Sequence, residues 1–557
     1  MSGRHFVADN AEAIARGVAG FCAVHADLVT LHAEPRYVAR ATPATEKVGL
    51  VSGGGSGHEP LHAGFVGEGM LDVAVPGEVF ASPSARQVRA ATEAADNGLG
   101  VLHIVKNYTG DVINFRLAAE ACRVAGIDVA TVVVDDDVPG AERGSTPGRR
   151  GTVATVVVEK VCGAAAEGGM LLDDLQALGR RVVDASRSVG VAIAAGTSYG
   201  TGESAFDLAD DEIEFGVGIH GERGTDRVAD EGLPALVRRC LDTIADDRGG
   251  LSGRQLLIIN GLGSTTPLEL YAAYAEAASQ LADRGVDVVR AVVDDLVTSL
   301  DMRGLSITLV AMDDELLRWW DEPARTPAWR TTPTAPLPAP RSGATEVATG
   351  ERRSDDPAVD DRVSTWADRV VAVIDAEHAA LGDLDRRVGD GDFGDNLATA
   401  ARHYAADRAG GNRLLALADA FSAIGGSSGP LLAVWFSAIA ANLSGTVDGA
   451  AIADGLMDGA TAVRELGGAV PGDRTMVDAM APAAVAAADH RDGSEAAVWA
   501  AAAHAASGAA DGTSDLVARK GRSSYLGESV RGAADPGAIA VALFLEAARD
   551  VFSDHTP

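Results

Sequence analysis

Cysteine is scarce in this chain, and the few cysteines are not spaced as metal ligands or as a disulfide framework. The 557 residues include only Cys22, Cys122, Cys162 and Cys240, all in the first half and none in a CxxC pair. This spacing argues against a structural zinc site and gives no sign of a disulfide scaffold. Aromatic residues are also few, at 4%. We therefore expect cores built from alanine, valine and leucine.

Positively charged residues are also few relative to acidic ones. The formal net charge is −33, and lysine occurs only at Lys47, Lys106, Lys160 and Lys520. A chain this acidic is not expected to bind nucleic acid or an anionic membrane surface. No apolar run approaches the length of a membrane-spanning helix, and the N-terminus lacks the apolar segment of a signal peptide. The sequence therefore predicts a soluble, cytoplasmic protein without a membrane partner.

The length of the chain exceeds what one hydrophobic core usually holds, so several domains are expected. Seven prolines lie between residues 323 and 357, and proline at this density favours an extended connector. We place a first domain at 1–332, a linker at 333–360 and a second domain at 361–557. Within the first domain we expect two subdomains, at about 1–185 and 186–332.

Short β-branched runs alternate with helical patterns throughout the first domain, which predicts an α/β fold with two subdomains. The predicted strands are Val48–Val51, Val101–Val105, Val129–Val134, Gln255–Asn260, Val286–Val293 and Leu305–Ala311.

The second domain has a different character, because its segments are rich in alanine and carry helical spacing, which predicts an all-α domain. The clearest predicted helices are Val363–Leu381, Leu414–Ile424, Leu431–Asn442, Ala451–Leu466 and Ala496–Ala506.

Three polar clusters in the first domain are candidates for a binding site. The glycine-dense segment Gly53–His58 follows an apolar run and is predicted to be a turn whose backbone approaches a ligand closely. Lys106 and Asp111 follow the end of a second predicted strand, and His220 stands among small residues. Each of these residues alone is more often an ordinary surface or core residue. Together they predict a ligand site beyond the carboxyl ends of the strands.

The second domain carries three carboxylates close together in sequence, at Asp385, Asp390 and Asp392. Like charges this close repel one another, and a divalent cation removes that repulsion. An acidic solvated loop is the alternative. No GxxxxGK[ST] motif occurs, so this is not a P-loop enzyme.

The motifs in both halves resemble the dihydroxyacetone kinase family. The first half carries Ser52-Gly-Gly-Gly-Ser-Gly-His-Glu-Pro60, Asn107-Tyr-Thr-Gly-Asp111 and Gly218-Ile-His-Gly-Glu222, as in the substrate subunit of that family. The second half resembles the family's nucleotide-binding subunit, an antiparallel helical barrel. The resemblance implies a kinase that transfers phosphate from ATP, with Mg²⁺, to a small ketose.

The resemblance also implies roles for individual residues of the first half. His220 would add to the ketone carbon and form a covalent hemiaminal, and a neutral imidazole is a reasonable nucleophile for a carbonyl. Asp111 would accept the proton of the terminal hydroxyl, with His58 assisting. The substrate would be held by Gly55, Ser56, Gly57, His58, Lys106 and Asp111.

For the second half, the resemblance implies that Asp385, Asp390 and Asp392 bind magnesium. The residues expected at the nucleotide are Phe393, Gly394, Asp395, Asn396, Ser427, Ser428, Gly467, Thr475, Met476, Arg522, Asp535, Pro536 and Gly537. Two positions depart from the family pattern. Phe393 stands where a histidine is common, and Arg223-Gly224-Thr225 follows the GIHGE motif where a proline is common.

The leading hypothesis is an ATP-dependent kinase that phosphorylates a terminal hydroxyl of dihydroxyacetone or of a four-carbon ketose such as erythrulose. Three alternatives remain open: a phosphoprotein-dependent ketose phosphotransferase, a lyase that cyclises a nucleotide such as FAD, and a non-catalytic ketose sensor. The family's habit suggests a homodimer.

Overall fold

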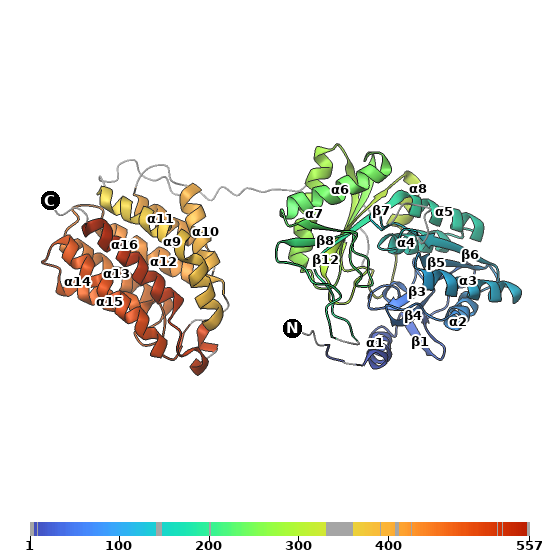
Figure 1. Cartoon of the computed structure of the whole chain (residues 1–557), viewed down its shortest axis with the longest axis horizontal. Helices are drawn as coiled ribbons and strands as arrows, with labels where there is room; N and C mark the ends of the chain where they lie inside the picture. Colours follow the sequence, from blue (N-terminus) through green and yellow to red (C-terminus); the bar gives the residue numbers. More distant parts are fainter. Residues whose placement is uncertain are drawn as a thin grey trace. The chain divides into compact units, whose positions relative to one another are not determined.

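The chain folds into two compact units, Met1–Ser342 and Gly343–Pro557, drawn in Figure 1. This computed structural model describes residues 5–7, 9–140, 148–199, 202–329, 360–389, 391–406, 412–424, 426–520, 522–525 and 527–553. Residues 333–359 of the predicted linker lie outside this set. None of the described helices combines the length and apolarity needed to cross a bilayer.

The first unit contains two six-stranded sheets. The first sheet has the order β1-β2-β4-β3-β5-β6, and β4, β3, β5 and β6 pair in parallel. Its strands are β1 (Val29–Ala33), β2 (Arg36–Arg40), β3 (Gly49–Ser56), β4 (Val73–Val79), β5 (Val101–Lys106) and β6 (Val129–Val134). The parallel strands place the carboxyl ends of β3 and β5 at one edge, where ligands collect in α/β folds.

The second sheet has the order β11-β10-β12-β7-β8-β9. Only β10 and β11 are parallel, and the other neighbours are antiparallel. Its strands are β7 (Ser186–Ala194), β8 (Glu212–Phe215), β9 (Asp226–Ala229), β10 (Arg254–Gly261), β11 (Asp287–Asp294) and β12 (Arg303–Ala311). The predicted α/β character of this half is confirmed.

Helices cover the sheets and fill the space between them (Figure 1). They are α1 (Asn10–Val24), α2 (Ala85–Ala95), α3 (Thr109–Val124), α4 (Ala154–Glu167), α5 (Leu172–Ala185), α6 (Leu233–Arg248), α7 (Pro267–Asp283) and α8 (Asp314–Asp321). Helix α4 is buried from Ala154 to Ala166 and contacts β3 and β5 of one sheet and β7 of the other. The two sheets therefore share one core around this helix.

The second unit is helical throughout its described residues, which confirms the predicted all-α domain. Its helices are α9 (Asp361–Val388), α10 (Phe393–Ala406), α11 (Arg413–Ser422), α12 (Ser428–Asn442), α13 (Gly449–Gly467), α14 (Val477–Asp489), α15 (Glu495–Gly512) and α16 (Pro536–Ser553). Each helix packs against the next, and α16 returns to α9, so the helices close into a barrel. Trp366, Trp435 and Trp499 are fully buried in its core among many alanines.

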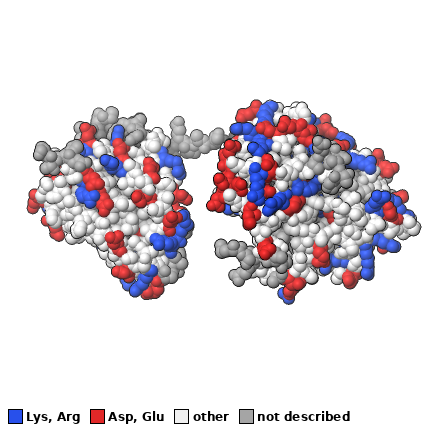
Figure 2. Space-filling model, viewed as in Figure 1, with Lys and Arg blue, Asp and Glu red and all other residues white. Residues whose placement is uncertain are grey.

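Acidic and basic side chains are interspersed over the visible face of both units (Figure 2). This face shows no continuous basic surface of the kind that a nucleic-acid backbone would need.

Candidate active site

The glycine-rich segment is a strand where the sequence predicted a turn. The register of β3 with β4 continues through Gly53, Gly54 and Ser56, so the chain turns only at Gly57, whose φ is +98°. The glycines accommodate neighbouring protein atoms. A Cβ on Gly53 would lie 2.6 Å from the Val75 carbonyl oxygen, and one on Gly55 would lie 2.7 Å from the Ala81 nitrogen. These glycines are therefore required by close packing between neighbouring segments of the chain.

His58 follows this strand and is fully buried. Its Nδ1 lies 2.9 Å from the Thr298 carbonyl oxygen, which belongs to the second sheet's half of the unit. A carbonyl only accepts, so Nδ1 carries the proton and Nε2 is left as an acceptor. Nε2 is buried and has no hydrogen-bond partner among the described residues. Burial holds the pKa of His58 well below its ordinary value, so the ring is a neutral base.

His220 lies in the loop after β8 and is brought against His58. The two ring centroids are 4.8 Å apart, and the edges of Tyr108 and Phe80 also face His220, at 4.2 and 5.5 Å. Burial lowers the pKa of His220 to about 4, so this imidazole is neutral at pH 7. An uncharged imidazole keeps the lone pair that a nucleophile needs.

The backbone at His220 is fixed by a charged network. Its N–H donates to Glu222 Oε2 at 2.8 Å, and Glu222 Oε1 accepts from Arg150 Nη1 at 3.1 Å. Arg150 also bonds Asp137 and the Gly216 carbonyl. These contacts hold both ends of the loop, so the imidazole is positioned before any ligand binds.

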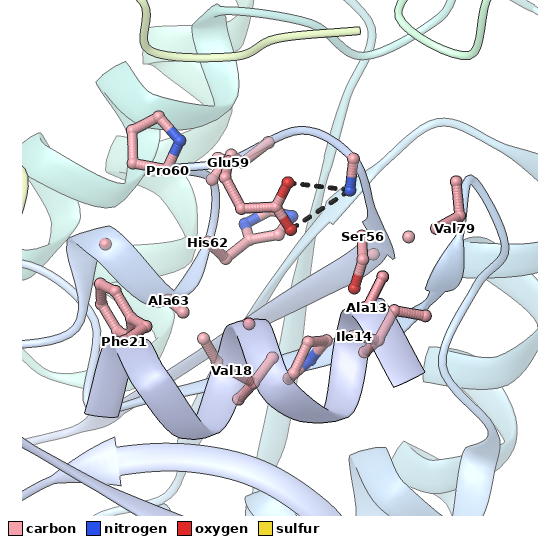
Figure 3. Close-up of a pocket in the computed structure, with 18 of the residues that line it drawn as sticks. Ala13, Ile14, Val18, Phe21, Ser56, Glu59, Pro60, His62, Ala63 and Val79 are labelled. Atoms are coloured by element: carbon pink, nitrogen blue, oxygen red, sulfur yellow. Dashed lines mark hydrogen bonds between the residues drawn. The ribbon is translucent and has the colours of Figure 1, made fainter. Parts of the chain in front are cut away.

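His220 lines a cavity of about 310 Å³ together with Phe80, Thr197, Tyr199, Ser299 and Leu300. The predicted binding residues Gly55, Ser56 and Gly57 line a different, larger cavity of about 520 Å³ (Figure 3). In that cavity Ile14, Val18 and Phe21 of α1 face the segment from Ser56 to Ala63. The two cavities share Val79, Tyr199 and Leu300 in their walls.

Lys106 and Asp111 meet at the edge that β3 and β5 share. Lys106 ends β5, and Asp111 lies in the first turn of α3. The Lys106 Nζ is 3.7 Å from Asp111 Oδ2 and 3.3 Å from the Gly53 carbonyl oxygen. Lys106 is fully buried and Asp111 is 3% exposed. Burial lowers the pKa of Lys106, whereas the charge of Asp111 opposes that shift.

Two buried residues beside Lys106 were missed from the sequence, His62 and Glu159. His62 Nε2 lies 2.8 Å from Lys106 Nζ, and His62 Nδ1 lies 2.6 Å from Glu159 Oε1. The signal for Glu159 was a charged pair, Glu159-Lys160, inside the apolar run Val156–Val161. A charge in such a run needs a buried partner, and the partner here is about 100 residues away in sequence.

The second unit has a cavity of about 220 Å³ that gathers most of the residues expected at a nucleotide. The predicted residues that line it are Asp385, Asp392, Phe393, Ser427, Ser428, Gly467, Thr475, Met476, Asp535, Pro536 and Gly537. They come from the end of α9, the start of α10, the start of α12, the end of α13 and the segments before α14 and α16.

Three predicted residues of this half do not line the cavity, and the side chains of two others are not described. Gly394, Asp395 and Asn396 continue α10 away from the cavity lining. A Cβ on Gly394 would lie 2.1 Å from the His378 carbonyl oxygen, so this glycine is needed for the packing of α10 on α9. The Phe393 ring is 6% exposed and belongs to the barrel core. Asp390 and the Arg522 side chain lie outside what the structure describes.

Carboxylates at this cavity fit a cation. Asp385 and Asp392 line it with Asp535, and Asp385 Oδ2 accepts from the Phe393 N–H at 3.2 Å. Burial raises the pKa of Asp535 to about 6, and the charges of Asp478 and Asp385 push it the same way. Divalent cations with a preference for oxygen, such as Mg²⁺, would relieve this repulsion. Among the described residues no group of three His, Cys, Asp or Glu side chains forms a complete metal site.

The sequence also did not single out Arg474, which lines the same cavity. Its side chain is 1% exposed, and Nη2 donates to the Ala533 carbonyl at 2.9 Å. Nε and Nη1 are buried without hydrogen-bond partners among the described residues. Arg474 also has a φ of +63°, rare for a residue with a side chain. Unpaired buried guanidinium donors are costly, so their orientation fits an anionic ligand such as phosphate.

Comparison with known proteins agrees with this division of the chain. Residues 19–328 match the Dak1 domain, and residues 387–550 match the DAK2 domain.

Relatives and solved structures cover almost the whole chain. An L-erythrulose 1-kinase from Mycolicibacterium smegmatis is 38% identical over 565 residues, covering 95% of this chain and 96% of its own. A triokinase/FMN cyclase from Rattus norvegicus is 36% identical over 571 residues, covering 96% of both. A crystal structure of the dihydroxyacetone kinase from C. freundii with AMP-PNP and Mg²⁺ superposes with a TM-score of 0.61. Its identity is 29%, over 98% of this chain and 99% of the other.

Proposed function

The chain belongs to the dihydroxyacetone kinase family, and on this premise we propose that it transfers phosphate from Mg²⁺-bound ATP to a terminal hydroxyl of a short ketose. One observation carries the proposal: the neutral ring of His220 lines a cavity and packs at 4.8 Å between ring centroids against His58, whose buried Nε2 has no hydrogen-bond partner among the described residues. A small molecule with a hydroxyl group would supply the hydrogen-bond donor that His58 Nε2 lacks among the described residues.

His220 is the nucleophile towards the ketone. Its unprotonated ring nitrogen forms the bond to the carbonyl carbon, the carbonyl oxygen gains a proton, and the other ring nitrogen loses one. The product is a neutral hemiaminal. This step selects ketoses over glycerol, because glycerol offers no carbonyl, and it fixes the terminal hydroxyl for reaction.

Asp111 and His58 supply the base for the terminal hydroxyl. His58 Nε2 is already an acceptor, and Asp111 is paired with the ammonium of Lys106. The hydroxyl proton moves to one of these groups as the oxygen attacks the γ-phosphate. Phe80 and Tyr108 enclose His220 and limit water at the reacting carbon.

The cavity of the second unit is the nucleotide site. Asp385 and Asp392 would hold magnesium, and Arg474 and the N-terminus of α12 at Ser428 would face the phosphates. When bound, the metal would screen the triphosphate charge during transfer.

Steady-state kinetics with three- and four-carbon ketoses tests the function. Dihydroxyacetone and both enantiomers of erythrulose are compared with glycerol at saturating Mg²⁺-ATP. We expect turnover of at least one ketose and none of glycerol. Equal failure on every ketose would overturn the proposal.

The name of the rat relative, triokinase/FMN cyclase, favours one second activity, cyclisation of a flavin nucleotide. Incubation with FAD and Mn²⁺, followed by chromatography, would show whether AMP and a cyclic flavin phosphate are released.

A further inference from the structure

Lys106 stands at one end of a buried hydrogen-bond network that leads away from the proposed ketose site. Lys106 Nζ lies 2.8 Å from His62 Nε2, and His62 Nδ1 lies 2.6 Å from Glu159 Oε1. Lys106, His62 and Glu159 are 0%, 5% and 0% exposed. This network runs from the edge of the first sheet to α4, the helix that contacts both sheets.

The direction of the hydrogen bonds in this network follows from Lys106. An ammonium only donates, so His62 Nε2 accepts and the His62 proton resides on Nδ1. That proton points to Glu159 Oε1, with the Ser52 hydroxyl at 3.0 Å from the same nitrogen. The hydroxyl of Ser52 donates in turn to the Ile104 carbonyl. Among the described residues Glu159 Oε2 has no hydrogen-bond partner. Glu159 is therefore connected to the Ser52 hydroxyl and to His62, which leads to Lys106.

We propose that Glu159 and His62 are positioning residues of the ketose site, which hold the Lys106 ammonium, and through it Asp111, in place for proton transfer. This inference rests on the role proposed for Asp111. A buried carboxylate without such a purpose is costly, and an apolar side chain would fill the same space more cheaply.

Lys106 and Glu159, at the two ends of this network, shift each other's pKa. Burial lowers the pKa of Lys106, and the charges of Asp111 and Glu159 oppose that shift. Burial raises the pKa of Glu159 to about 8, and Lys106 opposes that shift, so Glu159 is an anion only above about pH 8. The other ionisable groups that face Lys106 are His58, His62 and His220, and burial holds the pKa of each below its ordinary value. Once ionised, Glu159 joins Asp111 in favouring the charged form of Lys106.

The same helix offers a matched control in Glu167. Its Oε1 accepts from Arg40 at 2.7 Å and lies 3.9 Å from Lys47 Nζ. Glu167 raises the pKa of Lys47 as Glu159 raises that of Lys106. The substitutions Glu159→Gln and Glu167→Gln therefore remove one carboxylate each from the partners of two different buried lysines.

The scarcity of lysine makes the test direct. With only four lysines in the chain, ¹³Cε-lysine labelling of the full-length protein gives four NMR signals, assigned by substitution to arginine. His62 lines the cavity of Figure 3, so the network exchanges protons with solvent. Glu159→Gln should lower the titration midpoint of Lys106 and leave Lys47 unmoved, whereas Glu167→Gln should do the reverse.

Kinetics provides the second readout. Loss of the Glu159 charge should reduce kcat for the ketose about tenfold to a hundredfold in Glu159→Gln above pH 8, where the wild-type carboxyl is ionised. The KM for ATP should not change. The alkaline loss of activity should begin at lower pH, because Lys106 gives up its proton earlier. Glu159→Asp, which keeps the charge, should recover most of the rate, and His62→Gln, which interrupts the same hydrogen-bond path, replaces Glu159→Gln if that variant does not fold.

An unmoved Lys106 midpoint in Glu159→Gln would overturn the inference. So would equal shifts of Lys47 and Lys106, because these would indicate a general loosening of the fold. Failure of the wild type to phosphorylate any ketose would instead contradict the proposed function, and the NMR result would still stand by itself.

Discussion

The two halves of the molecule prepare their sites in opposite ways. In the first unit the polar groups are buried and paired with one another: Lys106 with Asp111 and His62, and His220 with the Glu222–Arg150 network. In the second unit the cavity has crowded carboxylates, together with two Arg474 nitrogens that have no hydrogen-bond partner in the described part of the chain. The proposed site for a neutral sugar balances its charges within the protein and leaves the His58 Nε2 acceptor for a ligand, whereas the proposed site for a charged nucleotide and metal needs its ligands to balance its charges.

The largest effect is expected from His220→Ala, which tests whether reaction with the ketone belongs to the first unit alone. Without the imidazole the carbonyl is not captured, so kcat/KM for the ketose should fall about a thousandfold or more. Binding of ATP, measured by calorimetry, should not change. If His220→Ala turned over the ketose at the wild-type rate and still rejected glycerol, the covalent hemiaminal would be ruled out.

Asp385→Asn is the reciprocal change in the second unit. It removes one carboxylate from the proposed magnesium site, so kcat/KM for Mg²⁺-ATP should fall about a hundredfold, and added Mg²⁺ should partly restore it. Ketose binding should be unaffected. Asp375→Asn, at an exposed position of the same helix, is the control. Equal losses in the two variants would argue against a metal role.

Arg474→Gln tests whether the guanidinium nitrogens Nε and Nη1 bind the phosphates of ATP. We expect the KM for ATP to rise about tenfold through loss of a charge-assisted contact, with the KM for the ketose unchanged. Arg491→Gln, which alters an exposed arginine paired with Asp454, should have no effect. A rise in the ketose KM instead would contradict this division of labour.

The smallest effect is expected when the pH is lowered and the affinity for the ketose is measured. The pKa of His220 is lowered to about 4, so the nucleophile becomes protonated only as the pH approaches that value. Binding should therefore change by less than about twofold between pH 7.5 and 5.5, whereas an imidazole with an ordinary pKa would lose about tenfold. Calorimetric titration of the ketose at both pH values measures this. A tenfold loss would show that the ring is not desolvated.

The sequence predicted the architecture well, because strands such as Val129–Val134 are continuous β-branched runs and the helices of the second unit are rich in alanine. It missed requirements that come from packing between distant segments. The glycines of β3 were predicted to form a turn, but they continue the strand, and a Cβ on Gly54 would lie 2.1 Å from Lys106 Nζ. No local pattern reveals that contact.

The candidate site shows the same limit. His58, Asp111 and His220 were found because their motifs resemble a known family, and the structure brings them together. Glu159 and Arg474 were missed, because their importance lies in burial and in partners that only the folded chain supplies. Charged residues within apolar or turn segments were the available clue.

One hydrogen bond described above bears on how the protein is made. The ring of His58 is oriented by the carbonyl of Thr298, 240 residues further along the chain. During translation the first sheet can form long before Thr298 leaves the ribosome. Until then the His58 ring lacks the carbonyl that orients it. We therefore expect the proposed reaction with a ketone to begin only when the whole first unit has been synthesised.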